Sequence, residues 1–415
     1  MSWEIATDIP AGNLIVDQID GDVARIRQDQ RGSTMPWFYW RFAVRGAQGR
    51  TVRFEFTDWE VIGTRGPCVS RDGGASWSWL GPASGSTRHF VFTFGPDDHD
   101  VQFCFCLPYL QADLDAFLAH SAIRRSILCR SRAGRDVEML TVGAAGADRR
   151  VLLTARHHAC ESSASFVLEA MLHEIATAGP GTAAAWLREN AHVVAIPFVD
   201  KDGVEAGDQG KARDGHDHNR DYIPTPRYVE TAAIMRVVRG GFVPQVAIDL
   251  HCPWIRGQHN EEIYQVGGPD PQRWLQQQEF GRILETQVGI APEPSRPLPS
   301  GEGWGERAKA HQAVQPPSPA DAARPRPLPE GEVQCLNYLQ SDDLPWGQAW
   351  NTDIASAEGC SCSKWMAHNG ARLSTSLEIP YANVRDITVT PRGLRDFGRR
   401  LAAAVGVFMQ HHDQE

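Results

Sequence analysis

Two short segments of this chain carry the histidine and glutamate residues that could bind a metal ion. His158 and Glu161 stand shortly after the apolar run 151–155, and His251 follows a second apolar run, 246–250. Short apolar runs predict buried strands, and the loops after strand ends build the sites of open α/β sheets. Two imidazoles and one carboxylate are the ligand set of a catalytic zinc ion that keeps a fourth position for water. The pattern therefore predicts one zinc ion per chain, bound by His158, Glu161 and His251.

Each of these residues alone has an ordinary explanation, because a histidine at a strand end is more often a structural hydrogen-bonding residue. The combination with Glu378, which ends a third predicted strand, is more specific. His157 could replace its neighbour as a ligand, but only His158 has the His-x-x-Glu spacing to Glu161. Glu378 by itself could be an ordinary surface carboxylate.

Asn219 and Arg220 stand between the first and second histidine segments, and Glu378 lies in the segment Ser-Leu-Glu-Ile-Pro-Tyr. With these pieces in this order the sequence resembles the zinc carboxypeptidases of the M14 family, and within it the cytosolic carboxypeptidase-like branch. The resemblance covers roughly residues 110–290 and 333–412. It implies that Glu378 is the general base that takes the proton of the attacking water. It also implies that Asn219 and Arg220 bind the terminal carboxylate of a peptide or protein substrate, which the planar fork of arginine suits.

The resemblance implies further roles for cations and for one tyrosine. Arg213 matches the family's arginine that polarises the scissile carbonyl, although Lys211 could serve instead. The cytosolic branch often acts on glutamate-rich chain ends, and such a substrate would require a cation in the side-chain pocket. Lys364 and Arg372 are candidates for that cation, and exposed surface charge is the commoner explanation for both. Tyr338 has the wrong spacing for the mobile tyrosine of secreted members and is left unassigned.

The first part of the chain is predicted to form a separate domain over residues 1–110. Short aromatic and β-branched segments, among them 37–44, 52–56 and 89–94, alternate with glycine-rich turns. Such a pattern predicts an antiparallel β-sandwich.

The remaining residues, 111–415, are predicted to form the catalytic domain. Strands alternate with helices, which we expect at 162–178, 182–190, 227–239 and from Pro391 onward. This alternation predicts an αβα sandwich around a mostly parallel mixed sheet. Residues 292–332 interrupt the pattern with a segment rich in proline and glycine, which predicts a disordered insertion because such a composition buries too little apolar surface to order itself.

Composition limits the classes of function. With 415 residues, of which 42% are hydrophobic, the chain can form two globular domains. A net charge of −10 argues against nucleic-acid partners, and no apolar run is long enough to span a membrane. Nine scattered cysteines and the absence of a signal-like start predict reduced thiols in the cytoplasm.

Two other functions remain open at this point. A zinc-dependent amidohydrolase of the desuccinylase and aspartoacylase type would use a similar ligand set on N-acyl amino acids. An inactive binding module would retain the fold, although such modules lose ligands or the catalytic glutamate, and this chain keeps all four residues.

Overall fold

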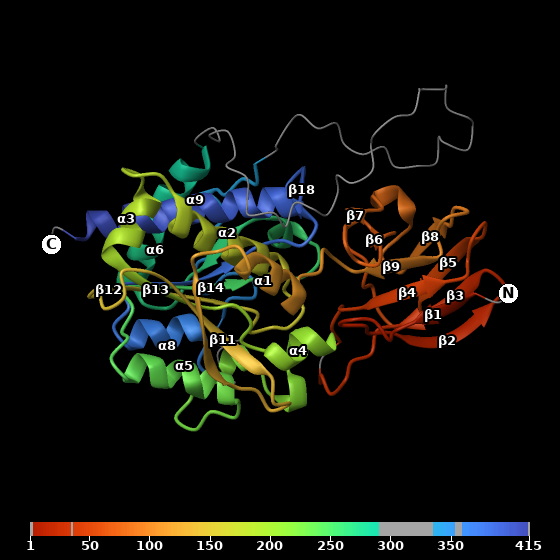
Figure 1. Cartoon of the computed structure of the whole chain (residues 1–415), viewed down its shortest axis with the longest axis horizontal. Coiled ribbons are helices and arrows are strands. Elements are labelled where there is room, and N and C mark those ends of the chain that lie inside the picture. Colours follow the sequence, from red (N-terminus) through yellow and green to blue (C-terminus); the bar gives the residue numbers. More distant parts are fainter. Residues whose placement is uncertain (1–2, 35, 290–334, 353–358, 414–415) are drawn as a thin grey trace.

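The computed structural model describes residues 3–34, 36–289, 335–352 and 359–413. These residues form two parts that lie side by side (Figure 1). We call residues 3–107 the N-terminal unit and the described residues from 108 onward the C-terminal unit. The predicted insertion at 292–332 lies outside the described residues.

Two β-sheets form the N-terminal unit. The strand order in one is β1 (Glu4–Ala6), β4 (Arg41–Arg45), β9 (Asp100–Cys104), β6 (Cys68–Ser70) and β7 (Ser78–Trp79). The order in the other is β2 (Ile15–Asp20), β3 (Val23–Arg27), β5 (Thr51–Phe56) and β8 (His89–Thr93). All neighbours are antiparallel except β3 and β5, so the prediction of an antiparallel arrangement is wrong for this pair. The chain enters the other sheet as β4 between these two strands, and a crossover of this length permits parallel pairing.

A seven-stranded mixed sheet forms the centre of the C-terminal unit. Its order is β10 (Arg124–Arg130), β11 (Asp136–Gly143), β13 (Ala191–Ile196), β12 (Arg149–Ala155), β14 (Val246–His251), β16 (Leu373–Glu378) and β15 (Tyr264–Val266). The four strands from β13 to β16 pair in parallel, and the remaining three join at the edges in antiparallel orientation. The central strands read as apolar runs because both of their faces are buried.

Helices cover both faces of this sheet (Figure 1). One layer consists of α2 (Ser163–Thr177), α3 (Ala183–Asn190), α6 (Pro271–Gly289) and α9 (Pro391–His411). The other contains α5 (Val229–Arg239) and α8 (Cys362–His368). Shorter elements are α1 (Gln111–Leu118), α4 (Lys201–Ala206), β17 (Asn383–Val384) and β18 (Ile387–Thr388). The predicted αβα sandwich with a mixed sheet is confirmed.

The predicted helices of the C-terminal unit agree with the structure to within about two residues at each end. The last helix begins as its sequence indicates, because Thr390 Oγ1 accepts the N–H of Gly393 at 3.0 Å and Pro391 occupies the first turn. Helix α6 was not predicted. Its buried side includes Gln277 and Gly281, so its apolar stripe is weak in the sequence.

The two units share one apolar core, which includes side chains from Trp3 to Met409. The change from sheets to alternating strands and helices falls between Cys104 and Gln111. A domain boundary at residue 110 remains our prediction, because this core is continuous across it. No helix in the described ranges has the length and hydrophobicity needed to cross a membrane.

Candidate functional site

The three predicted metal ligands lie together at the carboxyl edge of the central sheet. His158 and Glu161 occupy the loop between β12 and α2, and His251 is the last residue of β14. Because β12 and β14 pair in parallel, these ends meet at one place. The ligand atoms of the three residues lie within 4.8 Å of one another, and all three side chains are buried.

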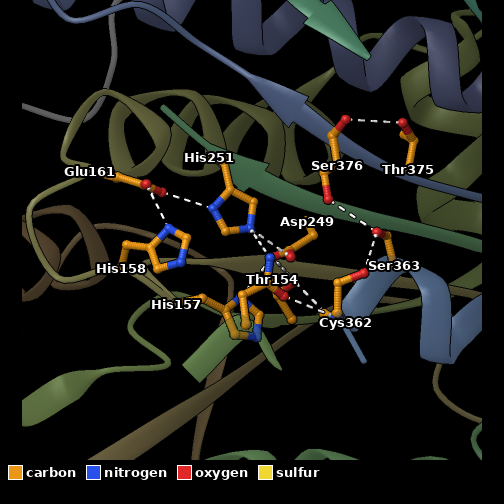
Figure 2. Close-up of polar contacts among 12 residues, drawn as sticks. Thr154, His157, His158, Glu161, Asp249, His251, Cys362, Ser363, Thr375 and Ser376 are labelled. Atoms are coloured by element: carbon orange, nitrogen blue, oxygen red, sulfur yellow. Dashed lines mark hydrogen bonds and ion pairs between the residues drawn. The ribbon is translucent and has the colours of Figure 1, made fainter. Parts of the chain in front are cut away.

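The orientation of both imidazoles fits a metal ion. His158 Nδ1 lies 2.6 Å from Glu161 Oε1, and His251 Nδ1 lies 2.8 Å from Glu161 Oε2 (Figure 2). The opposite nitrogens face other carboxylates, since His158 Nε2 lies 3.0 Å from Asp217 and His251 Nε2 lies 2.7 Å from Asp249. In the tautomer whose Nε2–H donates to these carboxylates, each ring presents its Nδ1 lone pair to Glu161. A lone pair facing a carboxylate at this distance requires a cation between them, either a proton or a metal ion.

The electrostatics of this cluster agree with that requirement. Burial disfavours the imidazolium form, but the Glu161 and Asp217 carboxylates outweigh burial and raise the pKa of His158. Burial likewise opposes the charged form of His251, and Asp249 and Glu161 raise its pKa well above the ordinary value. Burial alone would raise the pKa of Glu161, whereas the two histidines lower it to about 2. Without a metal, this pocket concentrates protons where a divalent cation would bind.

The buried arginine Arg156 shapes the loop that carries the first two ligands. Its backbone is left-handed, with φ of 61°, which redirects the chain directly after β12. Its Nε donates to the carbonyl of Ala159 at 2.9 Å, and its Nη1 donates to the carbonyl of Tyr109 at 2.9 Å and to Ser165 Oγ at 3.0 Å. These bonds fix the main chain between His158 and Glu161.

A second buried group lies behind His251 and consists of His157, Asp249 and Cys362. Its carboxylate is already occupied, because Thr154 Oγ1 donates to Asp249 Oδ1 at 2.7 Å and His157 Nδ1 lies 2.8 Å from the same oxygen (Figure 2). The other ring nitrogen of His157 lies 2.7 Å from the hydroxyl of Tyr222. We interpret this group as support for Asp249, which orients His251, and not as a second metal site.

Glu378 ends β16 directly beside His251 in the register of the parallel pair. It lines a cavity of about 200 Å³ together with His158 and His251. Burial and the nearby Glu161 carboxylate raise the pKa of Glu378 to about 7, although His251 acts in the opposite direction. A carboxylate with such a pKa can both accept and return a proton near neutral pH.

Asn219 and Arg220 line the same cavity from the short helical turn His218–Arg220. Asn219 Oδ1 accepts the N–H of Cys362 at 2.9 Å, so its NH₂ group is directed toward the His251 ring. Arg220 Nη1 donates to the carbonyl of Asn219 at 2.8 Å. The guanidinium is thus held at the cavity wall.

Comparisons with known proteins fit this arrangement, although no family model matches the chain. Cytosolic carboxypeptidase 2 of Xenopus tropicalis is 30% identical over 149 residues, which are 32% of this chain and 15% of that protein. Cytosolic carboxypeptidase 6 of Caenorhabditis elegans is 30% identical over 142 residues, or 32% of this chain and 30% of the relative. The matches therefore span less than a third of the length of these relatives.

Solved structures extend the likeness to the whole fold. A metallo-carboxypeptidase from Burkholderia cenocepacia superposes with a TM-score of 0.73 at 16% identity, covering 99% of this chain and 100% of the other. A metallo-carboxypeptidase from Pseudomonas aeruginosa was solved in complex with (2-guanidinoethylmercapto)succinic acid. It superposes with a TM-score of 0.69 at 17% identity, covering 98% of this chain and 99% of the other. The chain is thus similar to cytosolic carboxypeptidases over about a third of its length, and its whole fold is that of the metallo-carboxypeptidases. At such identities the structural likeness concerns the fold.

In the structure the Arg213 side chain lies between two carboxylates of neighbouring turns. Its guanidinium pairs with Asp200 and, at 3.0 Å, with Asp208. Of the described residues that line the cavity, Lys211 is one and Arg213 is not. The role of Arg213 at the substrate carbonyl therefore stays a prediction, and Lys211 is the alternative that the cavity lining favours.

The other candidate residues differ in whether they line the cavity. Lys364 lines the cavity, whereas Arg372 is absent from the described lining. Tyr338 is buried elsewhere and donates its hydroxyl to Asp343 at 2.8 Å. Arg273 lines the cavity and was missed, as were the supporting carboxylates Asp217 and Asp249. Asp249 could have been found, because it lies two residues before His251 on the same strand and so on the same side.

Proposed function

We propose that this protein is a zinc-dependent metallocarboxypeptidase that hydrolyses the C-terminal peptide or isopeptide bond of a peptide or protein. The observation that carries the proposal is that His158 and His251 line one cavity together with Glu378 and Arg220, while the third candidate ligand, Glu161, lies within 4.8 Å of both histidines. One zinc ion per chain would be held by His158, Glu161 and His251. When bound, it would polarise the scissile carbonyl and acidify a water molecule.

Residues of the chain would bind the substrate, transfer the proton and orient the metal ligands. Arg220, with Asn219, would bind the free α-carboxylate of the substrate through charge-assisted hydrogen bonds. Glu378 would take a proton from the attacking water and transfer it to the leaving amine. Asp217 and Asp249 would keep both imidazoles in the tautomer that presents Nδ1. Nine free cysteines support a reducing compartment such as the cytoplasm as the place of this reaction.

The proposal is tested with the purified full-length chain and a peptide whose C-terminus is either free or amidated. We expect one zinc per chain by elemental analysis and release of C-terminal residues from the free peptide alone. Equal cleavage of both peptides would contradict exopeptidase activity. Cleavage of N-acyl amino acids in place of peptides would establish the amidohydrolase alternative.

The ligand assignment has a matched control. His251→Ala should lose zinc and activity, because only two ligands remain. His173→Ala removes a buried histidine of α2 outside the cavity and should retain both. Full zinc content in His251→Ala would contradict the assignment.

A further inference from the structure

The N-terminal unit holds one short segment of the C-terminal unit, residues 206–211, through hydrogen bonds. Gln209 is fully buried, and its side-chain amide pairs with main-chain groups as a strand would. Its Oε1 accepts the Tyr39 N–H at 2.8 Å, and its Nε2 donates to the carbonyl oxygens of Tyr39 and Asp29, both at 2.9 Å. All three partners belong to the connection between β3 and β4.

Two glycines of this segment allow the N-terminal unit to approach closely. Gly207 has a φ of 73°, and a Cβ there would collide with the carbonyl of Ala11. Its own carbonyl accepts a hydrogen bond from Asn13 Nδ2 at 2.7 Å. A Cβ on Gly210 would collide with the Trp37 indole. The segment therefore has a backbone that suits contact with the N-terminal unit.

The segment ends at Lys211, whose main chain and side chain both contact the N-terminal unit. Ser33 Oγ donates to the carbonyl of Lys211 at 2.7 Å, and the Lys211 ammonium lies 5.6 Å from the centre of the Trp37 ring. Lys211 also lines the cavity that contains His158 and Glu378. Among the described residues, no carboxylate forms an ion pair with Lys211.

We infer that the N-terminal unit is part of the active site: through Gln209 it positions Lys211 as the cation that stabilises the oxyanion of the reaction. The inference rests on the proposed function and assigns to Lys211 the role that the resemblance implied for Arg213. A cation held by packing and hydrogen bonds needs no reorganisation when charge develops, which is how preorganised groups lower a barrier.

The chemical step leaves Lys211 unchanged. As the oxygen of water bonds to the carbonyl carbon, the π electron pair of the carbonyl moves onto its oxygen, and Glu378 takes a proton from the water. Lys211 donates a hydrogen bond to that oxyanion and keeps its own proton. When the pair returns, the C–N bond breaks with its electrons on nitrogen, and the amine receives the proton from Glu378.

Substitutions at Lys211 test the first half of the inference. Lys211→Met should lower kcat by about 10²–10³, the loss expected for one oxyanion donor, with zinc content and Tm unchanged. Lys211→Arg should recover part of the rate because it restores the charge. Unchanged kcat in Lys211→Met would overturn the inference.

Gln209→Met tests the second half, because it keeps the volume and removes the three hydrogen bonds. We expect kcat to fall by about 10- to 100-fold with a smaller change in KM, since the cation is misplaced. Arg256→Ala is the matched control. Arg256 also joins the two units, through Ile62 O at 2.6 Å and Glu60 at 2.7 Å, but it does not contact the 206–211 segment. Its kcat should equal that of wild type.

The two variants distinguish a positioning role of Gln209 from general loosening of the interface between the units. Equal loss of kcat in Gln209→Met and Arg256→Ala would show that general loosening of the interface is responsible, and would overturn the positioning role. Should Gln209→Met fail to fold, Ser33→Ala removes the hydroxyl bond to the Lys211 carbonyl and should lower kcat at unchanged Tm and zinc content. Wild-type protein that binds zinc but cleaves no peptide would contradict the proposed function itself.

Discussion

Glu378 combines two properties that the proposed reaction needs. It lies beside His251 in the sheet register, and burial with the nearby Glu161 raises its pKa to about 7. Arg220 lines the same cavity with its guanidinium held by the Asn219 carbonyl. At this scale the roles of base and carboxylate anchor can be separated by substitution.

Glu378→Gln should separate binding from catalysis. Glutamine keeps the shape of the side chain but cannot accept the proton of water, so turnover should fall by about 10²–10⁴. Zinc content and peptide affinity should stay near wild type, because Glu378 is not a proposed ligand. All three quantities are measured on one preparation. Loss of zinc together with activity would make Glu378 a ligand or a structural residue.

Arg220→Ala should weaken the binding of peptides that have a free C-terminal carboxylate. Removing one partner of a charge-assisted pair at a partly desolvated position costs roughly 2–5 kcal/mol. Amidation of the peptide should cause a similar loss in wild type and little further loss in the variant. If Arg220→Ala and amidation of the peptide lowered kcat/KM additively, a contact between Arg220 and the substrate carboxylate would be contradicted.

At the scale of elements, the edge of the sheet at β15 contains a second buried carboxylate. Asp343 accepts hydrogen bonds from the Gln265 N–H at 2.7 Å and from the Tyr338 hydroxyl at 2.8 Å. These bonds favour its charged form, but burial outweighs them and raises the pKa of Asp343 to about 7. The protonated form is therefore favoured in the folded protein.

This shift makes the free energy of unfolding depend on pH. The unfolded chain releases the Asp343 proton near pH 4, whereas the folded protein retains it up to about pH 7. The contribution of Asp343 is thus complete below about pH 4 and is lost as the pH rises to about 7. Asp343→Asn should reduce the slope of stability against pH between about 4 and 7, measured by urea unfolding. An identical slope in variant and wild type would contradict the raised pKa.

At the scale of the whole molecule, one apolar core joins both units, and the candidate metal ligands lie at the carboxyl edge of its central sheet. A metal ion bound only by the folded chain stabilises it by RT ln(1 + [L]/Kd), which is about 4 kcal/mol at a thousandfold excess over Kd. Removal of the metal should therefore affect the unfolding of the chain as a whole.

Chelation of the bound metal should lower the Tm by several degrees in scanning calorimetry, and added zinc should restore it. His251→Ala, which lacks a ligand, should show neither the fall nor the recovery. The same Tm before and after chelation of a zinc-loaded preparation would contradict a tightly bound ion.

The sequence by itself determined the elements that bring the ligands together. The apolar runs before His158 and His251 predicted buried strands because their pattern is local, and parallel pairing then places both strand ends at one edge. The capping pattern at Thr390 and Pro391 was likewise readable, since its hydrogen bond spans only three residues. The overall class of the fold followed from the alternation of such elements.

Only the tertiary structure decided which side chains enter the cavity. Lys211 and Arg213 stand two residues apart, and the resemblance favoured Arg213 without excluding Lys211. Lys211 lines the cavity and contacts Ser33 and Trp37 of the N-terminal unit, whereas Arg213 pairs with Asp200 and Asp208. Such choices depend on partners distant in the sequence, and their direction is set when the units pack together.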